Sequence, residues 1–313
     1  MLVLVSNRED LTADWLVLEL ERRDEPFVRL CTEDYPSKIR IGWTLNDAAL
    51  ELGESTLAAE DVTAVWWRRS VAPVIPAGRS PGEMAWAAGE SLAAWDGFWE
   101  GVNAHWVNTP GANAKAESKP AQLRAAKRLG MNVPATLITS SRAAARSFVE
   151  AEGTVVCKAL RSGLIPGVNG DRVLYTQPVD PQMLAGLEEL GPEPYLFQAL
   201  VEKSADVRVT VIGERVFACR IDSQSTPDAS VDWRRGSAED LHHESIELDE
   251  PTTRRLRDLT AGFGLRFAAI DLAVDRERGY VFFEINPNGQ WAWVEQLTGQ
   301  PLASALADEL LRR

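Results

Sequence analysis

The sequence predicts an α+β protein with mixed sheets. Short apolar runs that suit buried strands recur along the chain, apolar residues at helical spacing separate several of them, and strands dominate after about residue 195. The 313 residues, of which 45% are hydrophobic and 25% charged, suffice for two domains with sizeable cores.

Composition excludes several classes of function. No apolar run approaches the roughly 20 residues of a membrane-spanning helix, and the segment MLVLVSNREDL lacks a basic region followed by a cleavable apolar stretch, so we expect a cytoplasmic protein. The net charge of −13 argues against nucleic acids or anionic membranes as partners. Three cysteines without a CxxC pair and only three histidines argue against a disulfide framework or a histidine-based metal site.

Residues 1–112 are predicted to form an N-terminal domain. The run MLVLV fits a buried first strand, and alternating apolar residues suggest further strands at 15–20 and 62–69. Residues 106–112 resemble a strand that runs into a turn, which places the domain boundary there. Between them, a predicted helix at 82–102 carries a core-facing aromatic stripe of Trp86, Trp95, Phe98 and Trp99.

The rest of the chain is predicted to form a central subdomain at 113–195 and a C-terminal subdomain at 196–313. The helices are expected at 116–130, 141–153, 180–191 and 251–264. The strands are expected at 136–140, 154–160, 173–176, 195–202, 206–213, 215–222, 267–275 and 280–286.

The strongest local indication of chemistry lies in the last predicted hairpin. If Asp275 and Tyr280 close its turn, Asp271 lies opposite Glu284, and alternation places Asn286 on the same face as Glu284. Opposed carboxylates repel, and no lysine or arginine lies among their same-face neighbours on these strands. A hard divalent cation would relieve the repulsion, and Mg²⁺ bound together with phosphate suits these oxygen ligands. The alternative is an acid pair tolerated at the surface.

Two of only six lysines stand where an anion is expected. Lys119 begins the second part of the chain, and Lys158 lies inside the apolar strand VVCKAL, where a buried cation needs a partner such as phosphate. The loop at 162–171 contains three glycines whose backbone N–H groups could fold over phosphates, although it matches neither common glycine-rich phosphate motif. Alternatively, Lys158 reaches solvent from a sheet face.

A third pattern follows residue 196. The connector at 197–201 is apolar, so its backbone groups can contact a flat base. Asp206 and Arg208 alternate onto one face of the next strand. There the carboxylate could accept a hydrogen bond from a hydroxyl, and the guanidinium could bind a phosphate or carboxylate through two N–H groups. A surface ion pair is the alternative. The loop-rich segment beyond contributes Asp222, Asp232 and Arg234.

In their order along the chain, these features resemble an ATP-grasp carboxylate ligase over residues 110–313. More narrowly, FQALVEKSADVRVTVIG, RIDSQ, VDWR and EINPNGQWAWVEQLTG look like the ATP-grasp maturases of graspetides, the microviridin-type ribosomal peptides. The front segment with VWWRR is similar to the pre-ATP-grasp domain of those enzymes. The resemblance implies an α+β ATP-grasp fold preceded by a pre-ATP-grasp α/β domain.

The resemblance also implies residue roles. Lys119 and Lys158 would hold the α- and β-phosphates of ATP, and Asp206 would accept a hydrogen bond from the ribose. Arg208 and Arg234 would stabilise the γ-phosphate and the acyl phosphate. The residues expected to contact adenine through their backbone are Gln198, Ala199, Leu200 and Val201. Those expected to bind Mg²⁺ are Asp271, Glu284 and Asn286.

The implied reaction begins when an Asp or Glu carboxylate of a precursor peptide attacks the γ-phosphate. A Thr or Ser hydroxyl, or a Lys amine, of the same peptide then displaces phosphate and closes an ω-ester or ω-amide ring. Asp232 and Glu202 are the candidate general bases. The resemblance further implies a precursor with a leader and an acidic, Thr-rich core, and it is compatible with a homodimer.

Two other functions stay open at this level. An ATP-grasp ligase that joins a small-molecule carboxylate to an amine would share the nucleotide residues, and a non-catalytic nucleotide-binding module would share the fold. The text NPNGQWAW and the run Asp232-Trp233-Arg234 disfavour the first, and the intact acidic and basic set disfavours the second. We also expect Arg68 and Arg69 to face the active cleft, a solvated surface being the alternative.

Overall fold

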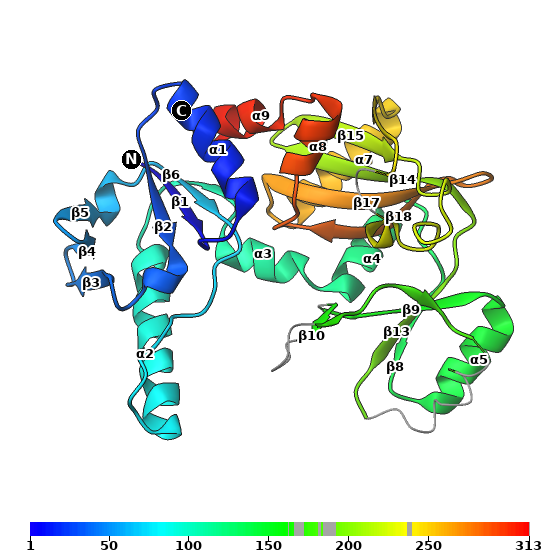
Figure 1. Ribbon diagram of the computed structural model, residues 1–313, viewed down its shortest axis with the longest axis horizontal. Helices are drawn as coiled ribbons and strands as arrows, with labels where there is room; N and C mark the ends of the chain where they lie inside the picture. Colours follow the sequence, from blue (N-terminus) through cyan, green and yellow to red (C-terminus); the bar gives the residue numbers. More distant parts are fainter. Residues whose placement is uncertain (162, 166–171, 181–182, 184–191, 237–239, 313) are drawn as a thin grey trace. The chain divides into compact units, whose positions relative to one another are not determined.

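The computed structural model describes residues 1–161, 163–165, 172–180, 183, 192–236 and 240–312 (Figure 1). The chain divides into two compact units. Unit 1 comprises Met1–Asn113, Gly264–Phe267 and Gln290–Arg313, and unit 2 comprises Ala114–Phe263 and Ala268–Gly289. The last residues of the chain therefore belong to the same unit as the first. The subdivision near residue 195 stays a prediction.

Unit 1 is built on a four-stranded parallel sheet in the order β2-β1-β6-β7. The strands are β1 (Leu2–Ser6), β2 (Phe27–Cys31), β6 (Ala64–Trp67) and β7 (His105–Val107). Both central strands, β1 and β6, are buried along their whole length, as parallel strands covered on both faces usually are. A smaller antiparallel sheet contains β3 (Ile39–Trp43), β4 (Ala48–Leu52) and β5 (Ser55–Ala58).

The helices of unit 1 include one that the sequence analysis assigned wrongly. Residues 15–20, expected as a strand, belong to α1 (Leu11–Arg22), in which Ala13, Leu16 and Leu20 are completely buried. These three positions share one helical face, so the helix buries them together while Leu18 stays exposed. The other helices are α2 (Pro81–Glu100), α8 (Ala292–Thr298) and α9 (Leu302–Leu310), and α3 (Pro110–Ala116) leads into unit 2.

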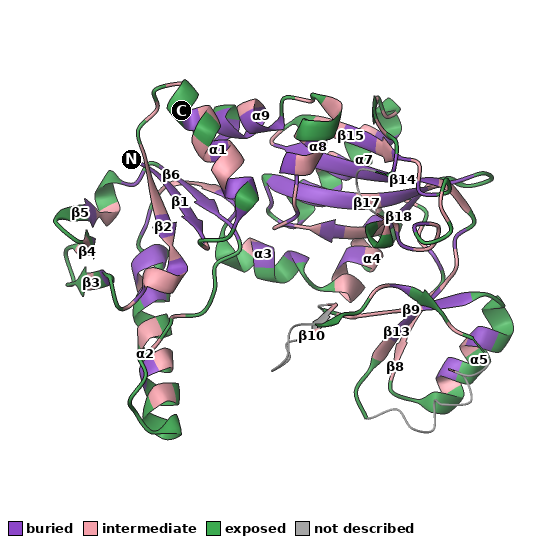
Figure 2. Cartoon of the chain, viewed as in Figure 1, coloured by how far each residue is buried: buried purple, intermediate pink, exposed green. Residues whose placement is uncertain are grey.

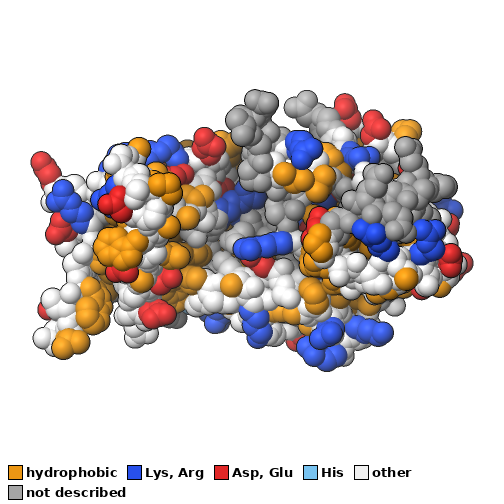
Figure 3. Space-filling view, turned by 90° about the horizontal axis from the view of Figure 1, so that it is seen from below, with side chains coloured by type: hydrophobic (Ala, Val, Ile, Leu, Met, Phe, Trp, Pro, Cys, Tyr) orange, Lys and Arg blue, Asp and Glu red, His pale blue; other side chains and the backbone are white. Residues whose placement is uncertain are grey.

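The aromatic stripe of α2 is only partly in the core. Trp95 and Trp99 pack with Trp67 at centroid distances of 6.4 and 5.5 Å, but Trp86 is 67% exposed. Figure 2 shows that the N-terminal part of α2 is largely exposed and its C-terminal part buried. The expectation that Trp86 is a core residue is therefore wrong, because the helix extends past the core that its last turns cover. Exposed apolar side chains of this kind appear orange in Figure 3.

A buried polar cluster in unit 1 corrects the expectation for Arg68. Its guanidinium, 1% exposed, donates to Asp10 at 2.7 Å and to the Gln290 side-chain oxygen at 2.8 Å. Asp10 also accepts from the Ser6 hydroxyl. Arg68 therefore holds unit 1 together from within, because a buried carboxylate needs a cation, and it does not face a cleft. Arg69 is exposed, and its place at the active cleft stays a prediction.

Unit 2 contains two larger sheets (Figure 1). The first, in the order β12-β9-β13-β8, consists of β8 (Thr136–Thr139), β9 (Val155–Lys158), β12 (Gln177–Pro178) and β13 (Tyr195–Ala199), and α5 (Arg142–Glu152) packs on it. The second, in the order β16-β15-β14-β17-β18, consists of β14 (Lys203–Ile212), β15 (Arg215–Ile221), β16 (His243–Ile246), β17 (Phe267–Asp275) and β18 (Gly279–Asn286). The helices α4 (Lys119–Arg128) and α7 (Glu250–Gly262) and the short pair β10 (Leu164–Ile165) and β11 (Arg172–Val173) complete the described part.

Two predicted segments fall largely outside the described residues, namely the glycine-rich loop at 162–171 and the helix at 180–191. Within the described part, no helix is long and apolar enough to cross a membrane.

Candidate functional site

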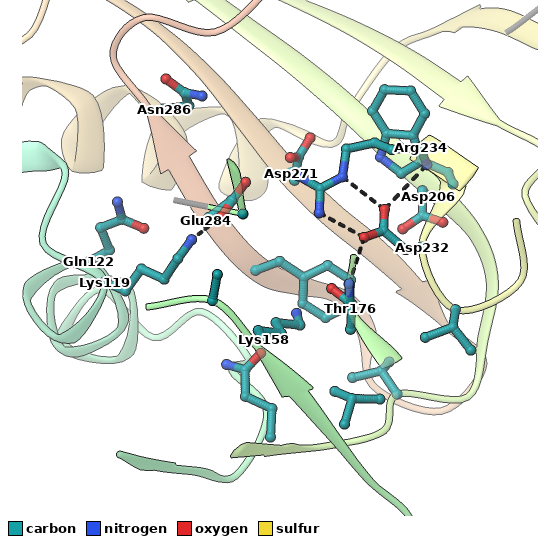
Figure 4. A pocket seen from close by; sticks show the side chains of 18 of the residues that line it. Lys119, Gln122, Lys158, Thr176, Asp206, Asp232, Arg234, Asp271, Glu284 and Asn286 are labelled. Atoms are coloured by element: carbon teal, nitrogen blue, oxygen red, sulfur yellow. Dashed lines mark hydrogen bonds and ion pairs between the residues drawn. The ribbon is translucent and has the colours of Figure 1, made fainter. Parts of the chain in front are cut away.

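A cavity of about 550 Å³ lies in unit 2 (Figure 4). This volume falls in the range of roughly 300–1,000 Å³ that is usual for small-molecule sites. Its walls come from α4, from β9 and β13 of the first sheet, from β14, β17 and β18 of the second, and from the segment at 231–234. The predicted residues that line it are Lys119, Lys158, Gln198, Ala199, Leu200, Val201, Asp206, Asp232, Arg234, Asp271, Glu284 and Asn286.

The β17–β18 hairpin places Asp271 opposite Glu284, the pairing that strand alternation predicts. The turn differs from the expected one, because Asp275 pairs with Gly279 instead of Tyr280. An irregularity in the register between Asp271 and Leu272 compensates for this one-residue difference, so that the two carboxylates still meet.

The same irregularity accounts for Phe283, which the sequence analysis missed. Leu272 pairs with Phe282 and Asp271 with Glu284, so Phe283 is an extra residue in β18, and it lines the cavity together with the adjacent Glu284. The ammonium group of Lys158 lies 4.4 Å from the centroid of the Phe283 ring, and that of Lys203 lies 5.8 Å away. The electron-rich face of the Phe283 ring therefore attracts both ammonium groups through cation–π interactions.

Each carboxylate of the opposed pair has a basic partner from another element. Lys119, the first residue of α4, donates to Glu284, and Arg208 of β14 donates to Asp271 at 2.6 Å. Neither strand itself supplies a cation, so a metal ion was expected to provide the whole countercharge; Lys119 and Arg208 come from other elements. Arg208 is 7% exposed and contacts the cavity wall through Asp271.

The two carboxylates differ electrostatically. Burial raises the pKa of Asp271, and the adjacent Glu284 charge adds to this effect against the opposing Arg208. For Glu284, burial acts in the same direction, but the charge and hydrogen bond of Lys119 outweigh it and hold its pKa at about 2. Glu284 is therefore anionic at neutral pH and available as a ligand for a cation.

Gln122, also missed, holds α4 against β18. Its side-chain amide donates to the backbone oxygens of Ala116 at 2.6 Å and Ile285 at 2.8 Å, and its oxygen accepts from the Ile285 N–H at 3.2 Å. Because β18 is the last strand of its sheet, Ile285 finds these partners in a side chain instead of another strand. The contact fixes Lys119, one turn earlier in α4, beside Glu284. The indication available in the sequence was a glutamine four residues before Ala126, on the same helical face of α4.

Asp232 and Arg234 form a bidentate pair in which Arg234 Nε and Nη2 donate at 2.8 and 2.7 Å. The backbone N–H of Thr176 also donates to Asp232 at 3.1 Å (Figure 4). Burial opposes ionisation of Asp232, but these donors outweigh it and hold its pKa at about 2. A carboxylate held in this way is a poor proton acceptor near neutral pH, so the geometry favours Asp232 as the group that orients Arg234. The guanidinium itself remains half exposed.

Lys158 and Asp206 are both perturbed by burial. Burial lowers the pKa of Lys158 to about 8, against the opposing effect of Glu284. Burial raises the pKa of Asp206, although Lys203 donates to it at 2.9 Å. The Lys203 side chain is 5% exposed. It was missed because only Asp206 and Arg208 were singled out on the strand that it begins.

In the connector, whose backbone was expected to contact a base, the N–H groups of Ala199 and Leu200 already have partners. The Ala199 N–H donates to the oxygen of Ala135, and the Leu200 N–H donates to that of Thr154, each at 2.9 Å. The side chain of Gln198 donates to Thr136. These two N–H groups therefore hold the connector against its neighbours in unit 2.

The donor set suits a nucleotide and a hard cation. Five basic residues line the cavity, namely Lys119, Lys158, Arg161, Lys203 and Arg234, and phosphates are ligands that such groups bind. The oxygens of Asp271, Glu284 and Asn286 are of the hard type that Mg²⁺ prefers. Among the described residues, no three His, Cys, Asp or Glu side chains cluster so that they could hold a metal ion, so Asn286 would complete this set.

Two family models together match almost the whole chain. Residues 1–113 match the family model of the MvdD pre-ATP grasp domain, and residues 113–310 match that of the RimK-like ATP-grasp domain. A comparison with curated proteins gave no match.

Three solved structures illustrate the similarity. The first is the macrocyclase MdnC bound with precursor peptide MdnA from Microcystis aeruginosa MRC (26% identity, 99% of each chain, TM-score 0.87). The second is a Chryseobacterium gregarium RiPP-associated ATP-grasp ligase in complex with ADP and a leader and core peptide (27% identity, 99% of this chain and 96% of that chain, TM-score 0.89). The third is the macrocyclase MdnB from Microcystis aeruginosa MRC (26% identity, 100% and 99%, TM-score 0.83). With its cavity of paired carboxylates and partly buried lysines, the chain belongs to the RimK-like ATP-grasp family and carries an MvdD-type pre-ATP-grasp domain.

Proposed function

We propose that the protein is an ATP-dependent ligase that closes rings in a ribosomally made precursor peptide through Asp or Glu side chains of that peptide. The observation that carries the proposal is the cavity in which Asp271 and Glu284 face each other beside Lys119, Lys158 and Arg234. The similarity to MdnC, MdnB and the RiPP-associated ligase extends over almost the whole chain and supports a peptide as the substrate.

The chemistry follows from the need to activate a carboxylate. A peptide carboxylate oxygen attacks the γ-phosphorus of ATP, and ADP leaves, which forms an acyl phosphate. A hydroxyl or amine of the same peptide then attacks the acyl carbon, loses a proton, and displaces phosphate. The net products are an ester or amide ring, ADP and phosphate. Several anionic groups meet in this reaction, so cations at fixed positions are required.

The residues of the cavity have distinct parts in this scheme. Lys119 and Lys158 hold phosphate oxygens, and Arg234, fixed by Asp232, stabilises the charge on the transferred phosphoryl group. Arg208 acts through Asp271, which it contacts directly. Asp206 accepts from the ribose, and the base lies along the connector at 198–201.

A divalent cation completes the proposed site. Asp271, Glu284 and Asn286 would hold Mg²⁺, which supplies positive charge to the phosphate oxygens when bound. Lys119 and Arg208 form ion pairs with Glu284 and Asp271 and so share in neutralising the two carboxylates. We also expect a partner peptide with a leader and an acidic, Thr-rich core. The homodimer and the cytoplasmic location stay predictions.

Intact-mass spectrometry tests the function. A candidate precursor peptide with a leader and an acidic, Thr-rich core is incubated with the enzyme, ATP and Mg²⁺, and each ring closed removes the mass of one water. The Glu284→Gln variant is the matched control, because it keeps the side-chain shape and removes the charge. An unchanged peptide mass, together with ATP hydrolysis stimulated by a small acid or amine, would favour a small-molecule ligase instead.

A further inference from the structure

The turn that follows β18 holds the side chain of Asn286. The N–H of Asn288 donates to the Asn286 side-chain oxygen at 2.9 Å, and the N–H of Gly289 donates to the Asn286 backbone oxygen at 3.3 Å. An amide oxygen has two lone pairs, so a hydrogen bond on one of them orients the oxygen and leaves the other for a cation. Groups that hydrogen-bond to a metal ligand usually orient that ligand in the same way.

Gly289 lies directly against Ala269. A Cβ atom added to Gly289 would overlap the Cβ of Ala269 and would lie 3.4 Å from the Asn286 backbone oxygen. Ala269 is completely buried in β17, where it pairs with Asn286 across the hairpin. Gly289 has no left-handed backbone, so the position requires glycine for space and not for conformation.

We propose that Gly289 is a positioning residue for Asn286. Its missing side chain lets the turn at 287–289 close onto β17, and this close approach sets the direction of the Asn286 side-chain oxygen. Any side chain at position 289 pushes the turn away from Ala269 and displaces the Asn286 side-chain oxygen, which the Asn288 N–H holds. The inference rests on the proposed metal site and adds a residue that the ligand set does not contain.

The experiment measures Mn²⁺ binding by electron paramagnetic resonance, with the full chain and a non-hydrolysable ATP analogue. Gly289→Ala should weaken Mn²⁺ affinity by about 10- to 100-fold, the usual effect of losing a partner of a metal ligand. Affinity for the analogue in the presence of EDTA should stay at the wild-type value, because the turn acts on the metal ligand alone. Gly97→Ala in α2 is the matched control, since a Cβ there meets no atom within 4 Å.

A second variant isolates the steric cause. Ala269→Gly removes the methyl group that the new side chain would meet, so the double variant Gly289→Ala with Ala269→Gly should recover most of the lost Mn²⁺ affinity. This variant also decides the question if Gly289→Ala alone unfolds, as judged by circular dichroism.

The outcomes separate this inference from the function on which it rests. If the wild-type protein binds no Mn²⁺ with the analogue, the metal assignment in the proposed function is wrong. If the wild type binds and Gly289→Ala binds equally well, or if the folded double variant shows no recovery, the positioning role is wrong while the metal site stands.

Discussion

Replacing Gln122 by methionine should loosen the junction between α4 and β18. Methionine has a similar length, but it cannot donate to the oxygens of Ala116 and Ile285 or accept from the Ile285 N–H. Ile285 is 1% exposed, so water cannot easily replace these partners. The buried backbone groups would therefore be left without hydrogen bonds, which costs more than the loss of an exposed contact.

The magnitude follows from the contacts. Three hydrogen bonds of about 1 kcal/mol each give a destabilisation of about 3 kcal/mol for local opening of this junction. Such a change speeds opening, and thus amide exchange, by roughly 100-fold. Because Lys119 lies one turn before Gln122, the KM for ATP should rise as well.

Hydrogen exchange followed by mass spectrometry measures the effect at β18 and α4. The control is Gln177→Met, since Gln177 is exposed on β12. If Gln122→Met exchanges at β18 as slowly as the wild type and the control, the side chain is not the clamp that its geometry indicates.

Three more predictions concern charge. Glu284→Gln should lower ligation by about 100-fold or more, because it removes a charge on which the transferred phosphoryl group depends, while the melting temperature stays near that of the wild type; ligation at the wild-type rate would contradict the metal assignment. Nucleotide affinity should fall as the pH rises through about 8, because burial lowers the pKa of Lys158 to that value and phosphate binds its protonated form. Calorimetry at pH 8 in two buffers should detect proton uptake on binding, which Lys158→Arg should remove; binding without uptake in the wild type would contradict this role. Arg68→Met should destabilise unit 1 by about 3–5 kcal/mol, because it leaves Asp10 buried without its cation; tryptophan fluorescence in urea measures this, and an unchanged midpoint would refute it.

Properties set by near neighbours were accessible from the sequence. Strand alternation in the last hairpin predicted that Asp271 lies opposite Glu284, and the pairing holds because the irregularity beside Leu272 offsets the one-residue error in the turn. The order of the lysines, the connector and the acidic hairpin indicated the ATP-grasp family, which the family models show. These features depend on spacing within one or two elements, and spacing can be read directly from the chain.

Other features depend on how distant segments pack. The strand expected at 15–20 is part of α1, because alternating leucines are compatible with either structure until a core covers one face. The partners of Asp271 and Glu284 come from β14 and α4, far away in the sequence. Arg68 was expected at a cleft, but Asp10 holds it in the interior.

The sequence by itself thus indicated the class of fold, the family and twelve of the residues that line the cavity. The tertiary structure alone decided which charges neutralise one another, that Phe283 enters the cavity beside Glu284, and that Gln122 joins α4 to β18. The physical reason is that periodicity is a local property, whereas electrostatic pairing and burial depend on three-dimensional neighbours that no short pattern specifies.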